Sequence, residues 1–201
     1  VAASLQGVVV CTSHASHYEL GVKALAKGLH VLMEKPMTTD VDEARKLAKA
    51  ADDAAKRSGA KFMVNNTASW RKQAMAAKEA VTAGSIGDVQ HVLCVMHSAL
   101  IWLFDDPANL GWTKTTGKMS GNGFGYGQAS HILAWVFQVT GLIPSEAYCV
   151  MSLSENSGAD MADAAVIRCT NGAAIVFSGS ASVPGNAHAD SVNNENVHSV
   201  G

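Results

Sequence analysis

The stretch Gly28–Pro36 (GLHVLMEKP) places a lysine directly after a short apolar run. The apolar residues Val31–Met33 are typical of a strand that a parallel sheet buries on both faces. Pro36 fixes its own φ angle and biases Lys35 towards an extended conformation, which should end the strand there. Because open α/β sheets bind ligands at the carboxyl ends of their strands, Lys35 is a candidate for chemistry. The alternative is an ordinary strand-to-helix turn with a surface ion pair.

Strand and helix patterns alternate on both sides of this stretch. Residues 7–12 form a β-branched run typical of a buried strand, and the helix that follows should stop at Gly28 with a left-handed C-cap. A second helix has its N-cap among residues 38–40 and stops before Gly59, and residues 61–64 form a third strand. The order β-α-β-α-β with short loops predicts right-handed crossovers and a parallel sheet.

The pattern changes after Asn65, and the second half of the chain indicates an α+β domain with a mostly antiparallel, open sheet. The signal for antiparallel pairing is Asn171-Gly172, a hairpin dipeptide between two strand-like runs. We place the domain boundary between residues 1–68 and residues 69–201. The elements expected in the second part are helices at 71–83 and 128–140 and strands at 89–102, 147–153, 164–169 and 173–180.

The composition excludes several classes of protein. Of the 201 residues, 48% are hydrophobic and 16% are charged, which is typical of a globular chain and not of a disordered one. The net charge of −2 gives no reason to expect nucleic acid or an anionic membrane as a partner. No apolar run reaches the roughly 18 residues of a membrane span, and the first residues show no signal-peptide pattern. We therefore expect a cytoplasmic location.

The four cysteines are far apart in the sequence and lie in apolar runs. Their spacing fits neither a zinc site nor a redox motif, so no metal is expected. We predict buried free thiols in a reducing compartment. The four are Cys11, Cys94, Cys149 and Cys169.

Polar side chains follow the first strand, in the segment Thr12–His17 (TSHASH). Hydroxyls, imidazoles and the free N–H groups of the next helix meet in this segment, which suits the binding of a dinucleotide. Helix capping alone, which Ser16 can satisfy, is the alternative explanation of the same residues.

Lys35 and His131 are the two candidates for proton transfer. A lysine that is desolvated against a cofactor ring can have its pKa lowered towards the working pH. His131 lies early in a predicted helix, behind the glycine-rich segment 120–127, whose backbone a ligand can approach closely. His131 also shares a helical face with Trp135, so a histidine of the hydrophobic core is the alternative.

These residues carry a resemblance to a known family. The block Ala24–Pro36 (ALAKGLHVLMEKP), the strand at Val8–Thr12, the helix with His17 and the glycine-rich loop before His131 together resemble the glucose–fructose oxidoreductase/inositol dehydrogenase (Gfo/Idh/MocA) family. The resemblance implies a two-domain dehydrogenase. A partial Rossmann-type sheet would bind NAD or NADP, and an α+β domain would form homo-oligomers through its open sheet. The implied reaction is hydride transfer between the nicotinamide and a carbon of a sugar or polyol.

The resemblance also implies roles for particular residues. Lys35 would bind the substrate hydroxyl and help to remove its proton, together with His131. Glu34 and Pro36 would frame the nicotinamide, Lys35 would also contact the cofactor, and Trp112 would lie near it. The further residues expected to line the nucleotide are Thr12, Ser13, His14 and His17, and those expected to contact the substrate besides Lys35 and His131 are Tyr126 and Gln128.

The chain also departs from the family pattern. The glycine-rich phosphate-binding turn of the family would precede Val1, so we expect a chain that is truncated at both ends and lacks the first β-α-β unit. Gly127 stands where the family often has an aspartate, Thr113 where it often has an arginine, and Ser13 where it usually has a proline.

Two alternatives to an active dehydrogenase stay open at this point. The first is a catalytically silent family member that binds a nucleotide or sugar as a sensor, which Gly127 favours. The second is a structural module that assembles through its exposed sheet. The choice between NAD and NADP is also open, because the residue that decides it would precede Val1.

Overall fold

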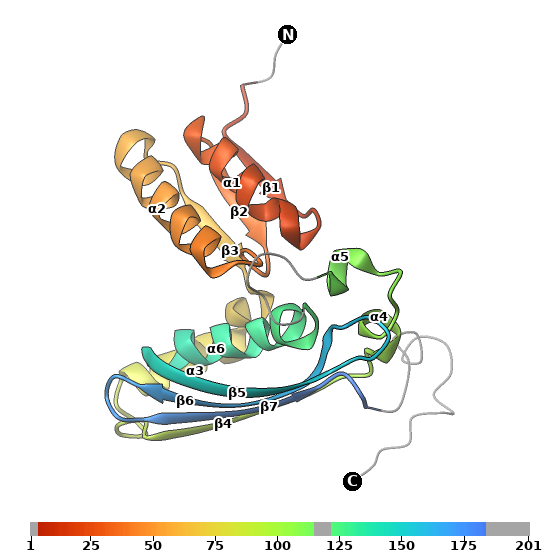
Figure 1. The fold of residues 1–201 in the computed structure, drawn as a ribbon. Coiled ribbons are helices and arrows are strands. Elements are labelled where there is room, and N and C mark those ends of the chain that lie inside the picture. Colours follow the sequence, from red (N-terminus) through yellow and green to blue (C-terminus); the bar gives the residue numbers. More distant parts are fainter. Residues whose placement is uncertain (1–3, 115–121, 184–201) are drawn as a thin grey trace. The chain divides into compact units, whose positions relative to one another are not determined.

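The computed structural model describes residues 4–114 and 122–183 of the chain (Figure 1). These residues form two compact units, the first within residues 4–66 and the second made of residues 67–114 and 122–183. Each unit has its own sheet and its own hydrophobic core.

The first unit is a parallel three-stranded sheet with two helices (Figure 1). Its strands lie in the order β1-β2-β3, and α1 packs against β1, β2 and α2. This is the α/β arrangement that the alternation of strands and helices predicts. In chain order the elements are β1 (Gly7–Val10), the 3₁₀ turn η1 (His14–Ser16), α1 (His17–Ala26), β2 (His30–Glu34), α2 (Val41–Ser58) and β3 (Phe62–Asn65).

Strand β2 lies in the middle of this sheet and buries the side chains that face the helices. Met33 and Leu47 of α2 are fully buried, and a Cβ on Gly21 of α1 would lie 2.8 Å from Met33 Cε, so the glycine lets α1 pack closely. On the opposite face of the sheet Leu32 is half-buried, and its neighbour Val9 on β1 is 67% exposed. The prediction of a strand buried on both faces is therefore wrong within the described residues, where the helices cover one face.

Both helices of the first unit end at the glycines that the sequence indicates. Gly28 follows α1 with φ 75°, and Gly59 caps α2 with φ 71°, a conformation that side-chain-bearing residues rarely adopt. The N–H of Gly59 donates to Ala55 O at 2.9 Å. Arg57 Nη2 in the last turn of α2 donates to Leu25 O in α1 at 2.8 Å, which joins the ends of the two helices.

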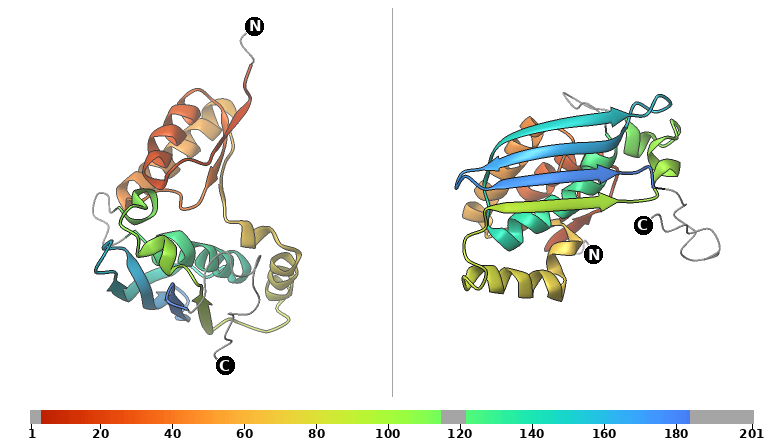
Figure 2. Two further views of the ribbon diagram at one scale, coloured as in Figure 1. Left: turned by 90° about the vertical axis from the view of Figure 1, so that its right-hand side faces the viewer. Right: turned by 90° about the horizontal axis from the view of Figure 1, so that it is seen from below.

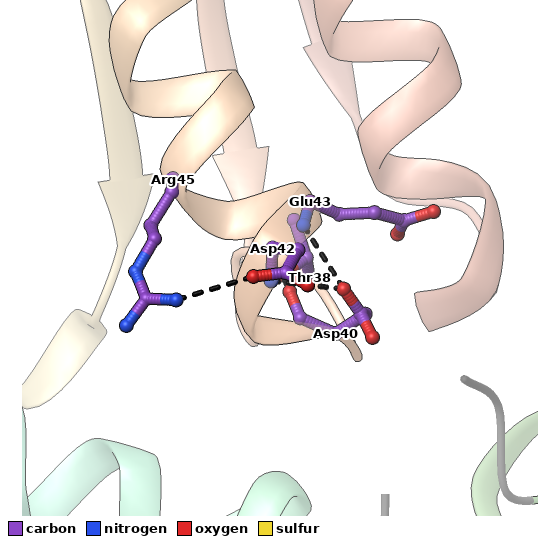
Figure 3. A network of polar contacts seen from close by, with 5 residues as sticks. All are labelled: Thr38, Asp40, Asp42, Glu43 and Arg45. Atoms are coloured by element: carbon purple, nitrogen blue, oxygen red, sulfur yellow. Dashed lines mark hydrogen bonds and ion pairs between the residues drawn. The ribbon is translucent and has the colours of Figure 1, made fainter. Parts of the chain in front are cut away.

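The start of α2 is fixed by a side-chain cap (Figure 3). Asp40 Oδ1 accepts the backbone N–H of Asp42 at 2.9 Å and that of Glu43 at 3.0 Å. Thr38 Oγ1 donates to Asp40 O at 2.8 Å and so holds the residues before the cap. A cap of this kind is worth about 1 kcal/mol, and here it anchors the far end of the segment that follows Lys35.

The second unit is a four-stranded mixed sheet with α6 packed on one face and α3 packed against α6 (Figure 1). Its strands lie in the order β4-β7-β6-β5, with β5, β6 and β7 antiparallel and β4 parallel to β7. In chain order the elements are the 3₁₀ turn η2 (Thr67–Trp70), α3 (Lys72–Thr82), β4 (His91–His97), α4 (Ile101–Phe104), α5 (Leu110–Thr113), the π turn η3 (Gly125–Ala129), α6 (Ser130–Thr140), β5 (Pro144–Leu153), β6 (Asp160–Cys169) and β7 (Ala174–Ser180).

Several elements of the second unit differ from the prediction. Strands β5 and β6 begin at Pro144 and Asp160, before the predicted starts at 147 and 164. The strand predicted at 89–102 ends at His97, and the chain then turns into α4, which buries Phe104 completely. A continuous apolar run does not by itself distinguish a strand from a short helix. The helix predicted at 128–140 begins at Ser130, because the π turn η3 precedes it.

One face of the second sheet is apolar and exposed, and Figure 2 (right) shows its strands side by side with no helix in front of them. The covered face buries Ile175 completely and leaves Phe177 3% exposed. Val176 of β7 is half-buried on the uncovered face, and five other large apolar side chains there are each more than half exposed. They are Leu93 and Val95 of β4, Tyr148 and Val150 of β5, and Val166 of β6.

All four cysteines are free thiols, as expected, but only two of them are buried. Cys94 and Cys169 lie in the core of the second unit. Cys11 follows the end of β1 and Cys149 lies on β5, an edge strand of the sheet, and both are exposed. The prediction of burial is wrong for these two, because an apolar run at a strand end or an edge is not covered. Across residues 4–114 and 122–183, no helix combines the length and the apolar character that crossing a bilayer requires.

Candidate functional site

The parallel pairing of β1 and β2 brings two predicted segments to the same edge of the first sheet. Val10 at the end of β1 lies beside Met33 of β2. The chain therefore leaves β1 into Thr12–His17 and leaves β2 into Lys35 and Pro36 on the same side, the edge at which open α/β sheets bind ligands. The nucleotide-binding residues predicted for the first unit are thus neighbours.

His17 joins these two segments from inside the protein. It is the first residue of α1, and its side chain has no exposed surface. Nδ1 lies 2.7 Å from Pro36 O, and Nε2 lies 3.1 Å from Thr12 O. The sequence predicts that His17 lines the nucleotide. In the structure its buried ring links the segment after β1 to the segment after β2.

Replacing His17 by alanine should lower the free energy of unfolding by about 2–4 kcal/mol, because a cavity forms and the carbonyl group that accepts the ring N–H loses its donor. His91 is exposed on β4, and His91→Ala should change stability by less than about 0.5 kcal/mol. Urea unfolding of both variants beside the wild type measures the difference. Equal stability of the two variants would contradict the bridging role of His17.

Lys35 is a buried basic residue at the carboxyl edge of the first sheet. Its residue is 7% exposed, and burial lowers the pKa of its ammonium group, while the nearby Glu34 carboxylate acts in the opposite direction. Glu34 is held in turn, because Asn65 at the end of β3 donates its Nδ2 hydrogen to Glu34 Oε2 at 3.1 Å. The peptide bond between Lys35 and Pro36 is cis. A lysine with a lowered pKa can accept a proton nearer to neutral pH than a solvated lysine can.

The hydroxyls that follow β1 bond to one another. Ser16 Oγ donates to Ser13 O at 2.8 Å and lies 2.6 Å from Thr12 Oγ1. Ser16 makes no side-chain cap to α1, so the explanation of this segment by capping alone is wrong. Thr12 and Ser13 are exposed and accessible to a ligand, whereas His14 is 5% exposed, with its ring centroid 6.0 Å from that of His17.

The candidate substrate residues of the second unit lie on and just after the π turn. Tyr126 and Gln128 belong to η3, His131 lies in the first turn of α6, and all three are half-buried. Ser130 Oγ donates to Tyr126 O at 2.9 Å, which ties the turn to the start of α6. The backbone of Trp112 lies in α5, and its side chain falls outside the described part of the structure.

Gly127, where the family often has an aspartate, is surrounded closely. A Cβ at this position would lie 3.0 Å from Cζ of Phe104, a fully buried ring. An aspartate would require this ring to move, so the glycine and the phenylalanine fit each other sterically. Within residues 4–114 and 122–183, no group of three or more His, Cys, Asp or Glu side chains is arranged to hold a metal ion.

Comparison with known proteins identifies the class. The model of the oxidoreductase family with an NAD-binding Rossmann fold matches residues 2–65, and that of the GFO/IDH/MocA C-terminal domain matches residues 74–195. The chain is 26% identical over 154 residues to scyllo-inositol 2-dehydrogenase (NADP(+)) IolW of Bacillus subtilis (strain 168), which covers 77% of this chain and 40% of that protein.

Solved structures share the fold. An oxidoreductase domain protein from Kribbella flavida has a TM-score of 0.76 at 27% identity, over 88% of this chain and 48% of the other. GenD2 from gentamicin A biosynthesis, crystallised in complex with NAD, has a TM-score of 0.71 at 21% identity, over 90% of this chain and 49% of the other.

The first unit has the parallel sheet of a Rossmann domain and matches the NAD-binding domain of an oxidoreductase family. The chain belongs to the Gfo/Idh/MocA family, with residues of both the N-terminal and the C-terminal domain. It spans about 40% of the length of the curated relatives it matches. The family model that matches its first unit is that of an NAD-binding Rossmann fold.

Proposed function

We propose that the protein carrying this chain is an NAD(P)-dependent dehydrogenase that oxidises a hydroxyl carbon of a sugar or polyol. The observation that carries the proposal is Lys35, buried at the carboxyl end of β2 with a lowered pKa. The name of IolW, an inositol dehydrogenase, supports the polyol class. The family often has an aspartate at the position of Gly127, so Lys35 and His131 would have to manage the hydroxyl proton between them.

The residues of the first unit fit the nicotinamide dinucleotide. Exposed Thr12 and Ser13 lie at the strand edge where such ligands bind, and His17 holds this segment against Pro36. When bound, the dinucleotide supplies the hydride acceptor. In the oxidation, the substrate carbon loses its hydrogen as a hydride and the hydroxyl loses a proton, which neutral Lys35 Nζ accepts.

The remaining residues have positioning or binding roles in this proposal. Glu34, held by Asn65, keeps its carboxylate beside Lys35 and frames the nicotinamide with Pro36. His14 and Trp112 contact the nucleotide. Tyr126 and Gln128 on the π turn bind substrate hydroxyls, and His131 exchanges the proton with solvent.

Replacing His131 by asparagine should lower turnover by about tenfold to a hundredfold, because Lys35 keeps the first proton transfer. The dependence of turnover on pH should also be simpler in this variant than in the wild type, because one of the two proposed proton-transfer groups is absent. Gln138→Ala is the control, because Gln138 lies on the same helix and its side chain also makes a hydrogen bond, to Ser69 O. This control variant should keep its turnover. If His131→Asn unfolds the protein as a core substitution would, the core-histidine explanation is correct instead.

The first test is calorimetric titration of the folded chain with NADH and NADPH, followed by spectrophotometric assay with inositols and aldoses on the longest natural form. Micromolar binding and cofactor reduction by one of these substrates support the proposal. Binding without turnover on the whole panel would favour the sensor alternative, for which Gly127 is the structural observation.

We further propose that the protein forms homo-oligomers through the uncovered face of the second sheet and that it works in the cytoplasm. The exposed apolar side chains of β4, β5 and β6 support the first point, since contiguous apolar surface marks interaction sites. The free thiols support the second. Sedimentation of wild type beside Tyr148→Lys tests the interface, and a monomeric wild type would refute it.

A further inference from the structure

Two buried aspartates lie on β6 beneath the glycine-rich loop. Asp160 is 1% exposed and Asp163 is 5% exposed. Residues three apart on a regular strand point to opposite faces, but the register shifts here. Ser152 of β5 pairs with Ala162 and Leu153 pairs with Asp160. The extra residue on β6 forms a β-bulge, which changes the direction of the neighbouring side chains. Both carboxyl groups therefore face the helical side of the sheet.

Asp160 binds the backbone of the glycine-rich loop with both of its oxygens. Oδ1 accepts the N–H of Gly123 at 2.8 Å, and Oδ2 accepts the N–H of Gly125 at 2.5 Å. A Cβ on Gly123 would lie 2.2 Å from Asp160 O, so the loop approaches β6 as closely as a backbone can. Bonds from two N–H groups favour the charged form of a carboxyl group.

Asp163 is the second carboxyl group, and its surroundings favour the neutral form. Its Oδ2 is buried and has no hydrogen-bond partner among the described residues, and it lies 3.4 Å from where a Cβ of Gly125 would be. It borders an apolar cavity of about 390 Å³ between the π turn and β5. Burial, then the charge of Asp160 and a hydrogen bond with it, raise the pKa of Asp163 to about 7.

The other titratable groups near the pair are few and do not neutralise it. Cys149 of β5 lines the same cavity, and burial and the charges of Asp163 and Asp160 raise the pKa of its thiol. Tyr126 lines the cavity from the π turn. Asp105, which follows α4, accepts hydrogen bonds from Ser154 and Asn156 instead. Among residues 4–114 and 122–183, no lysine, arginine or histidine lines this cavity.

We infer that Asp160 and Asp163 share one proton and act as a positioning pair, in which the charged Asp160 clamps the loop Gly123–Gly125 and the proton on Asp163 removes the repulsion between them. The clamp sets the start of the π turn that carries Tyr126 and Gln128 and leads into His131. Loss of the shared proton puts two like charges in an apolar site and loosens the loop. The consequence for catalysis rests on the proposed function, whereas the clamp itself does not.

Hydrogen exchange of the intact chain tests the clamp, read by mass spectrometry on peptides that span residues 122–129. Protection factors, corrected for the intrinsic exchange rate, should fall by about tenfold in the wild type between about pH 6 and about pH 8.5. Asp163→Asn mimics the neutral carboxyl group and should keep its protection at both pH values. Asp160→Asn should lose about tenfold at both, because the charged acceptor of two N–H groups is gone. Asp88 is exposed, and Asp88→Asn is the matched control.

Two results would overturn the inference. One is Asp163→Asn losing protection with pH as the wild type does, and the other is Asp160→Asn remaining as protected as the wild type. Carboxyl-carbon NMR adds a direct readout, in which Asp163 should titrate near pH 7. Because none of these measurements needs cofactor or turnover, a failure of the proposed dehydrogenase activity leaves them unaffected. Conversely, full activity with a pH-independent loop would reject the clamp alone.

Discussion

Replacing Lys35 by methionine is expected to lower turnover by roughly 10²–10⁴-fold, with dinucleotide affinity changed by less than about threefold. The residue is 7% exposed at the strand edge where the proposed reaction would remove a hydroxyl proton, and methionine keeps its length and apolar stem without a basic group. Steady-state kinetics and cofactor titration on the longest natural form of the protein measure both quantities. Unchanged turnover would remove Lys35 from the chemistry.

The stability of the same variant separates chemistry from folding. Burial lowers the pKa of Lys35 in the folded chain, so the folded state releases its proton at a lower pH than the unfolded state. The group therefore favours folding at pH values above its ordinary pKa, and this contribution is lost as the pH falls through the folded pKa. At neutral pH, removing the charge should leave the variant at least as stable as the wild type. Lys35→Arg keeps a permanent charge and should be as inactive as the methionine variant.

The elements that the sequence predicts well are those whose signals are local. The apolar run of β2, the left-handed Gly28 and Gly59, and the Asp40 cap each depend on residues a few positions apart. The predicted hairpin at Asn171-Gly172 forms for the same reason, with Cys169 N–H donating to Ala173 O at 2.8 Å. Local propensity and the global fold agree at these positions, which is typical of natural sequences.

The features that the sequence does not reveal depend on pairing between distant segments. His17 is recognisable as a candidate, but its buried bridge to Pro36 joins residues 19 positions apart. The parallel pairing of β4 with β7 joins strands that are separated by most of the second unit. A hairpin signal predicts the neighbour along the chain and gives no information about such a partner.

The acidic pair is the clearest omission among the candidate functional residues. Asp160 and Asp163 stand at a spacing that indicates opposite faces of a strand, and the bulge opposite Ser152 and Leu153 reverses this. An available signal was the presence of two acids at the start of an apolar strand, where an unpaired charge is costly. Similarly, the sequence does not explain Gly127. The structure shows that Phe104 occupies the space that a side chain at this position would need.

Asp163→Asn should make the protein more stable at mildly alkaline pH and should flatten the dependence of its stability on pH. The pKa of Asp163 is raised to about 7 in the folded chain from its ordinary value of 3.8. Between these two values the folded state holds a proton that the unfolded state has released, so the free energy of unfolding falls as the pH rises through this window. The loss from this one group, complete above pH 7, is on the order of 2–4 kcal/mol.

The amide cannot ionise, so the variant avoids this loss. Near pH 5 it should be about as stable as the wild type, because it resembles the protonated carboxyl group, and near pH 8 it should exceed the wild type by about 2–4 kcal/mol. Urea unfolding at both pH values measures this, with Asp88→Asn on the exposed surface as the control that should follow the wild type. If the wild type and Asp163→Asn lose the same stability between these pH values, the prediction is wrong. Both aspartates would then be ionised in the folded wild type. The charge that clamps Gly123 and Gly125 would then be stabilised by the loop N–H groups alone.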